Sequence, residues 1–150
     1  MIEWMIMPLK RYFEFNGRSR RKEFWSFALL NVIVYFVLFA IMAAGGLPLG
    51  ALDNPSASAA FGPIAWLGLA LLALWALAIV IPSIAVAVRR LHDRDMSGWW
   101  YLGVIIVSMI PFIGIFASIG FLVLMALPGT DGPNRYGPDP KDPSNAEVFA

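Results

Sequence analysis

Three long apolar blocks, separated by short polar segments, set the pattern of this chain. Residues 24–44, 64–88 and 99–127 contain no Asp, Glu, Lys or Arg. At 1.5 Å per residue, the first two blocks are long enough as helices to cross a hydrocarbon core of about 30 Å. A charge at the centre of a bilayer costs roughly 2.5–3.5 kcal/mol. We therefore expect the blocks to lie in lipid and the charged segments between them to lie in water.

The third block allows two arrangements. As one helix it would be about 43 Å long, which is long for one crossing, whereas two full crossings need about 40 residues. Pro111 and Gly114 divide the block into unequal halves. The pattern thus predicts either one kinked crossing or a hairpin that turns at residues 111–114, and we favour the hairpin. The predicted fold class is an all-α, small polytopic transmembrane helical bundle, with three or four membrane helices in a single domain.

The polar segments differ in composition. Residues 1–23 mix aromatic with basic side chains, which suits an element in the headgroup layer. A frayed tail is the alternative there, and Pro8 should interrupt a helix. Residues 45–63 are rich in Gly and Pro and contain one charge, Asp53. Residues 128–150 are again rich in Pro and Gly, and this composition alone predicts a flexible tail.

Basic residues predict the orientation. They are concentrated in residues 1–23 and in the charged segment 89–98, and residues 45–63 contain none. Because Lys and Arg are enriched in cytoplasmic loops, the N-terminus and residues 89–98 are expected in the cytoplasm and residues 45–63 outside. The tail has too few cations to indicate its own side.

Three polar or small residues inside the blocks predict helix packing. Asn31 should hydrogen-bond a neighbouring helix, because facing lipid would leave its amide unpaired. Gly114 and Ser118 are four residues apart, so they could form a surface on which a second copy of the chain packs closely.

The composition narrows the possible chemistry. Hydrophobic residues make up 59% and charged residues 14%, against about 45–50% and 25% in ordinary soluble domains. Without cysteine, and with a single histidine, the chain cannot form disulfides or a site of several histidines. We predict no catalytic residue, no metal and no cofactor. The basic residues 18–22 resemble a nucleic-acid patch, but beside a membrane helix they indicate contact with anionic lipid headgroups.

Three polar motifs together resemble one known family. They are GRSRRKEFW at residues 17–25, RRLHD with SGWW at residues 89–100, and PGT with NRYGPDP at residues 128–140. In order and spacing they look like the domain-of-unknown-function-805 family of small bacterial inner-membrane proteins. The resemblance implies a multi-pass protein of the bacterial inner membrane and implies no reaction.

The motifs all lie at membrane boundaries, which suggests that they meet. If the tail returns to the cytoplasmic side, their charged residues can form one cytoplasmic polar cluster that orders the tail against residues 89–98. Carboxylates in such a cluster would also offset the unfavourable placement of cations at the start of a helix. The candidate members are Arg18, Arg20, Arg21, Glu23, Arg89, Arg90, His92, Asp93, Arg135 and Asp139.

The function most consistent with the sequence is non-catalytic. We expect an integral inner-membrane protein that interacts with anionic lipid headgroups, with a second copy of itself or with another membrane protein, and not with nucleic acid. One alternative is a small transporter or channel subunit, although charge inside the membrane blocks is missing. A less favoured alternative is a membrane enzyme that uses His92 and Asp93, since imidazole titrates near neutrality.

Overall fold

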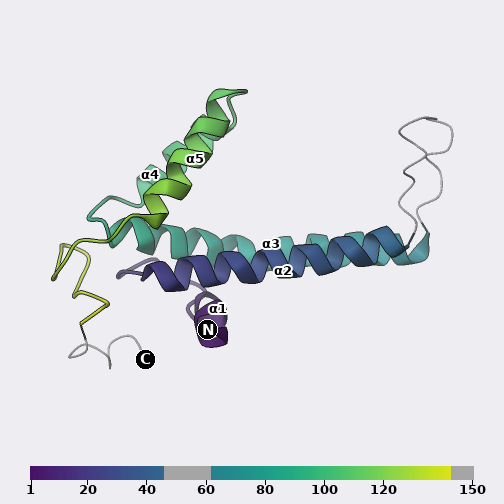
Figure 1. Ribbon diagram of the computed structural model, residues 1–150, viewed down its shortest axis with the longest axis horizontal. Helices are drawn as coiled ribbons and strands as arrows, with labels where there is room; N and C mark the ends of the chain where they lie inside the picture. Colours follow the sequence, from purple (N-terminus) through teal and green to yellow (C-terminus); the bar gives the residue numbers. More distant parts are fainter. Residues whose placement is uncertain (46–61, 143–150) are drawn as a thin grey trace. The chain divides into compact units, whose positions relative to one another are not determined.

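The computed structural model describes residues 1–45 and 62–142, and these form five helices and no named strand. The helices are α1 (Ile2–Lys10), α2 (Arg21–Ala44), α3 (Pro63–His92), α4 (Trp99–Ser108) and α5 (Ile113–Ala126) (Figure 1). α2 and α3 are long and apolar enough to cross a membrane. The prediction of an all-α helical membrane fold is confirmed. Most of the predicted outer loop 45–63, and the last part of the tail, lie outside the described residues.

The chain divides into two compact units. One, here called the polar unit, comprises Met1–Ala28 and Ile81–Ala150; the other, the apolar unit, comprises Leu29–Val80. All eleven Lys and Arg residues of the chain belong to the polar unit. In the described part of the apolar unit there is no charged residue at all. Among the described residues, charge is therefore confined to the polar unit, which also contains the third apolar block.

Within the apolar unit, α2 and α3 pack closely and antiparallel. A Cβ added at Gly68 would lie 3.0 Å from the Cα of Met42, so the absence of a side chain lets the two backbones approach. Farther along, the indole Nε1 of Trp75 donates a 3.2 Å hydrogen bond to the Oδ1 of Asn31. The predicted interhelical hydrogen bond of Asn31 is therefore confirmed, and its partner is a tryptophan.

Two helix boundaries differ from the sequence prediction. α3 continues to His92, so the first residues of the predicted charged segment 89–98 are helical. Their side chains are buried among partners in the polar unit, which removes the reason for the helix to stop at the first charge. α1 contains Pro8 in its last turn, where we expected an interruption. The helix ends two residues later, and the proline ring is buried.

The third apolar block forms the favoured hairpin, α4–α5. The rings of Tyr101, near the start of α4, and Phe121, near the end of α5, lie 5.5 Å apart, so the helices are antiparallel. In the turn, the N–H groups of Ile113 and Gly114 donate to the carbonyls of Pro111 and Ile110, each over 2.8 Å. Such internal pairing allows a turn to lie in apolar surroundings.

The hairpin is too short to cross a membrane twice. α4 has 10 residues and α5 has 14, which correspond to about 15 and 21 Å. Both are well short of the hydrocarbon thickness of about 30 Å. The hairpin thus has the dimensions of a re-entrant element, which enters a membrane and returns to the same side.

The space beside Gly114 is filled by the backbone of the hairpin itself. A Cβ at this position would lie 2.2 Å from the carbonyl oxygen of Ser108 and 2.8 Å from its carbonyl carbon. The close contact that we expected Gly114 to offer to a second copy is therefore made within the chain.

We predict that Gly114→Ala opens the turn and destabilises the protein by about 1–3 kcal/mol, because backbone atoms must move to admit the methyl group. Gly120→Ala, in the same helix, is the matched control, since a Cβ there would meet nothing within 4 Å. It should be neutral or stabilising by up to about 1 kcal/mol. Thermal unfolding in detergent micelles measures both, and equal unfolding temperatures for the two variants would contradict the packing.

Candidate functional site

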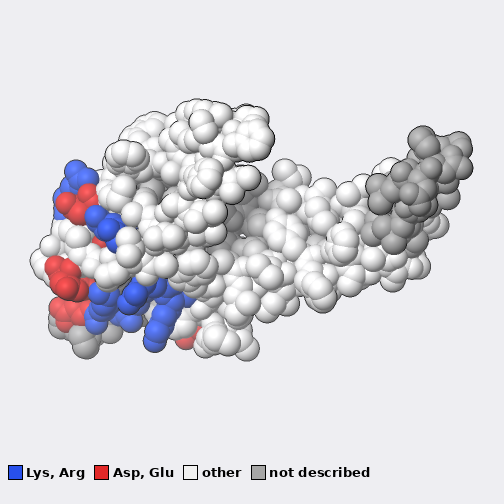
Figure 2. Space-filling model, turned by 45° about the horizontal axis from the view of Figure 1, so that its top comes forward, with Lys and Arg blue, Asp and Glu red and all other residues white. Residues whose placement is uncertain are grey.

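Charged side chains of the polar unit gather where three distant segments meet. These segments are the residues that precede and begin α2, the end of α3 with the loop that follows it, and the tail after α5. Figure 2 shows Lys, Arg, Asp and Glu together over one region of the surface, while the rest of the visible face is largely without charge. Several of the charges are not on the surface at all, and these form the core of the site.

Asp93 is the centre of the site. Its Oδ1 accepts a 2.9 Å hydrogen bond from Nε of Arg18, and its Oδ2 accepts one from Nη1 of Arg90. The exposed fractions are 1% for Asp93, 1% for Arg18 and 0% for Arg90. One buried carboxylate therefore serves two buried guanidinium groups. Such a charge set persists only if the remaining N–H groups also find acceptors.

Backbone carbonyls of the tail satisfy Arg18. Its Nη1 donates to the carbonyl of Gly132 and its Nη2 to the carbonyl of Thr130, each over 2.6 Å. The tail also bonds directly to Asp93, because the backbone N–H of Thr130 donates to the Asp93 carbonyl over 2.8 Å. These contacts order a segment whose composition alone predicted flexibility.

The end of α5 supplies acceptors to the second arginine. Nε of Arg90 donates over 3.1 Å to the carbonyl of Met125, and Nη2 donates to the carbonyl of Leu127. Arg94 adds a 3.1 Å bond to the carbonyl of Pro128. The last carbonyls of a helix lack intrahelical donors and carry partial negative charge. Arg90 thus caps α5 and attaches it to the end of α3, and Arg94 binds the first residue of the tail.

The tail passes Asp93 without any gap. A Cβ at Gly129 would lie 1.9 Å from Oδ2 of Asp93 and 2.8 Å from its carbonyl oxygen. Only glycine fits between these atoms. The Pro-Gly-Thr motif of the tail and the His-Asp motif at the end of α3 therefore form one close-packed contact.

A second buried pair links the start of α2 to α3. Nη2 of Arg89 donates over 2.7 Å to Oε1 of Glu23, and Oε2 of Glu23 accepts a 2.8 Å bond from the hydroxyl of Ser19. The N–H of Ser19 bonds to the carbonyl of Arg89 over 3.1 Å. Glu23 is 2% exposed, and its charge also offsets the cations at the N-terminus of α2.

His92 is engaged by its neighbours rather than by Asp93. Its ring stacks on Tyr136, with centroids 3.8 Å apart and planes 3° from parallel. Nδ1 lies 3.2 Å from the carbonyl oxygen of Gly17, so this nitrogen must carry the proton and donate. The carbonyl of His92 accepts a 2.8 Å bond from Nδ2 of Asn134. Since both oxygens of Asp93 bond to arginines, the acid–base pair required by the enzyme alternative is not formed.

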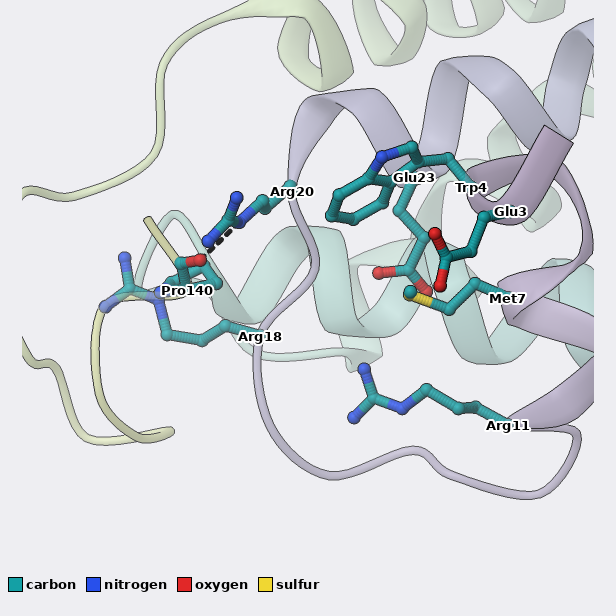
Figure 3. Close-up of a pocket in the computed structure, with 8 residues that line it drawn as sticks. All are labelled: Glu3, Trp4, Met7, Arg11, Arg18, Arg20, Glu23 and Pro140. Carbon is teal, nitrogen blue, oxygen red and sulfur yellow. Dashed lines mark hydrogen bonds between the residues drawn. The ribbon is translucent and has the colours of Figure 1, made fainter. Parts of the chain in front are cut away.

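Arg20 attaches the rim of the site to the tail, and Asp139 holds the tail in its fold. Nε of Arg20 donates to the carbonyl of Pro140, and its guanidinium lies 5.7 Å from the ring centroid of Trp4 (Figure 3). Burial acts to raise the pKa of Asp139, but hydrogen bonds from the backbone N–H groups of Lys141 and Gly132 hold it below its usual value. Both N–H groups are in the tail, so this carboxylate folds the tail onto itself.

Arg135 and Arg21 lie farther out. Nε of Arg135 is 3.1 Å from Oδ1 of Asp95 in an exposed ion pair, and its guanidinium lies 4.8 Å from the ring centroid of Tyr136. Nη1 of Arg21 donates over 3.3 Å to the carbonyl of Ala126.

The predicted residues therefore fall into an inner and an outer group. The inner, buried group holds Arg18, Glu23, Arg89, Arg90, His92 and Asp93, and the outer group holds Arg20, Arg21, Arg135 and Asp139. The prediction omitted most of the partners, because many are backbone carbonyls, which no residue type indicates. Ser19, Asn134 and Gly129 could have been suspected, since they belong to the polar motifs. Among the described residues, no three potential metal ligands gather.

Comparisons with known proteins agree with the motifs. The family model described as "Protein of unknown function (DUF805)" matches residues 12–138, which confirms the resemblance. "Inner membrane protein YhaI" of Escherichia coli (strain K12) is 39% identical over 144 residues, covering 96% of this chain and 100% of that protein. "Inner membrane protein YhaH" of the same strain is 39% identical over 140 residues, covering 93% and 98%. "Uncharacterized protein YiiR" is 30% identical over 148 residues, covering 87% and 88%. No solved structure matches the chain.

We predict that Asp93→Asn destabilises the protein by about 3–5 kcal/mol, because it leaves two buried guanidinium groups without their shared counter-charge. The tail should then detach readily, and trypsin should cut after Arg135 more than tenfold faster in detergent micelles. Asp95→Asn, two residues away, removes only an exposed ion pair and should change stability by less than about 1 kcal/mol. Equal cleavage rates in the two variants would show that Asp93 does not hold the tail.

Proposed function

The chain belongs to the DUF805 family of proteins of unknown function. Relatives that it matches over nearly their whole length are named inner membrane proteins. We propose that this protein is a non-catalytic, multi-pass component of the bacterial inner membrane. Its buried charges attach the tail to the two membrane helices, and its exposed cations bind anionic lipid headgroups.

The full hydrogen bonding of Arg18 and Asp93 carries the non-catalytic assignment. Both oxygens of Asp93 have guanidinium partners, and each of the three nitrogens of Arg18 donates to a protein acceptor. A catalytic or substrate-binding charge must exchange partners with a ligand and must be reachable by it. Arg18 and Asp93 are each 1% exposed. Their arrangement is that of a structural lock.

The same lock supports a topology. Arg18 precedes α2, Asp93 follows α3 and Thr130 follows α5, so direct contact among the three requires them to share one side of the membrane. By the distribution of Lys and Arg, that side is the cytoplasm. In this topology α2 and α3 cross the bilayer, while the short α4–α5 hairpin enters it from the cytoplasmic side and returns.

A shallow cavity at the start of α2 supports binding to headgroups. It has a volume of about 420 Å³ and is lined by Arg21, Lys22, Trp25 and Ala126. The side chain of Lys22 is exposed and has no partner among the described residues. Trp25 is 40% exposed, and tryptophan beside cations at a helix end is typical of the membrane interface. A lipid phosphate can therefore reach Lys22 without displacing a protein contact.

Fusions at the C-terminus test the topology. A fluorescent protein attached after Ala150 should fluoresce, and alkaline phosphatase at the same position should be inactive, because the tail is cytoplasmic. A fusion within the loop between α2 and α3 should give the opposite pair of results. Phosphatase activity at the C-terminus would exclude the re-entrant hairpin and would separate the tail from Arg18.

The headgroup proposal is tested with Lys22→Gln. Near an anionic membrane surface one Lys contributes about 1 kcal/mol, so the affinity for phosphatidylglycerol, titrated into phosphatidylcholine nanodiscs, should fall about fivefold. Lys141→Gln is the control, since this exposed lysine is in the tail and lies 3.4 Å from Asp131. The same loss in both variants would indicate general charge attraction and contradict a site at α2.

A further inference from the structure

The polar unit contains a cavity that is separate from the buried ion pairs of Asp93. It has a volume of about 560 Å³, within the range of about 300–1,000 Å³ that is usual for small-molecule sites. Its walls come from the segment before α2, the end of α3, the start of α4 and the tail. The lining is aromatic and aliphatic around a few polar groups: Phe15, Asn16, Ile84, Val88, His92, Ser97, Gly98, Trp99, Tyr101, Leu102, Ile105 and Tyr136.

None of the described residues that line this cavity is Asp, Glu, Lys or Arg. Burying a charged ligand there would remove it from water without a counter-charge, which is strongly unfavourable. The chemistry of the walls therefore selects a neutral, largely apolar molecule. Trp99 is 77% exposed and Leu102 46% exposed, and both belong to the hairpin that is expected in lipid. Such a molecule can enter from the membrane.

His92 determines which polar group the molecule carries. Its Nδ1–H is held by the carbonyl of Gly17, so the neutral ring presents Nε2 as a hydrogen-bond acceptor. Stacking on Tyr136 fixes the plane of the ring. Gly98 packs against Val88, because a Cβ there would lie 2.7 Å from Cγ1 of Val88, and the same position is at an ordinary contact distance, 3.5 Å, from Nε2 of His92. Nε2 is therefore the polar atom of His92 that is left for a ligand. Because Nε2 is an acceptor, the ligand must supply a hydrogen-bond donor.

We propose that this cavity binds a neutral membrane-soluble molecule that has a hydroxyl group, whose O–H donates to Nε2 of His92 while its apolar body lies against Leu102 and Ile105. The site is separate from the headgroup cavity at Lys22, so either can exist without the other. A long-chain alcohol and a quinol share the required chemistry.

The single histidine of the chain gives a direct readout. With ¹⁵N-histidine protein in phosphatidylcholine nanodiscs, which offer no hydroxyl donor, the ¹⁵N resonance of unprotonated Nε2 should shift to lower frequency as 1-decanol is added, and the shift should saturate. Decyl methyl ether should bind about fivefold more weakly and leave Nε2 unshifted, since it lacks one hydrogen bond of about 1 kcal/mol. A decyl-substituted hydroquinone, titrated in the same way, compares a quinol with the long-chain alcohol. Saturable binding of either hydroxyl compound supports the site, and the tighter one identifies the class.

Matched tryptophan variants locate the binding. Leu102→Trp fills the cavity from its exposed side and should abolish the shift, whereas Ile106→Trp, in the same helix but not in the lining, should preserve it. Both retain His92, and the undisturbed Nδ1 resonance shows that each variant is folded. The proposal is overturned if Nε2 carries the proton, if alcohol and ether bind equally, if no probe shifts Nε2, or if Leu102→Trp binds like the unmodified protein.

Discussion

The structure of the polar unit depends on one buried carboxylate shared by two buried arginines. Asp93 lies between Arg18 and Arg90, and neither guanidinium reaches water. Removing Asp93 would leave two uncompensated buried cations, which is far more unfavourable than the loss of a surface pair. The remaining donors are directed at backbone carbonyls of α5 and the tail. The geometry of these carbonyls is thereby imposed by charge, since the tail has little apolar surface with which to fold.

This arrangement explains how a chain rich in apolar residues contains a precise polar structure. In the described part of the apolar unit, close helix contact is accompanied by the Asn31–Trp75 hydrogen bond. The polar unit combines a short hairpin, a tail rich in Pro and Gly and the ends of two long helices. Hydrophobic burial gives no preference among lipid-facing surfaces. Directional, charge-assisted hydrogen bonds therefore specify how these parts fit together.

Much of the fold follows from the sequence, because membrane helices are set by length and the absence of charge. The sequence predicts the two long helices in this way. It also predicts the break at Pro111–Gly114 from the residue types there, and the interhelical hydrogen bond of Asn31 from its polar side chain. The end of α3 is not, since Arg89 and Arg90 resemble a water-facing boundary until their buried partners are known. For the candidate site, charge pattern indicates which residues gather. It cannot indicate that Thr130 and Gly132 bind Arg18 through their carbonyls, nor that His92 turns its proton toward Gly17 instead of Asp93.

The contact between Arg18 and the tail has a consequence for biosynthesis. Thr130 and Gly132 follow Arg18 by 112 and 114 residues, so a ribosome produces this arginine long before its acceptors. Until then Arg18 has to remain in water or among lipid headgroups. The polar unit can close only after the segment that contains Thr130 and Gly132 has emerged, which makes its closure a later event than the insertion of α2 and α3.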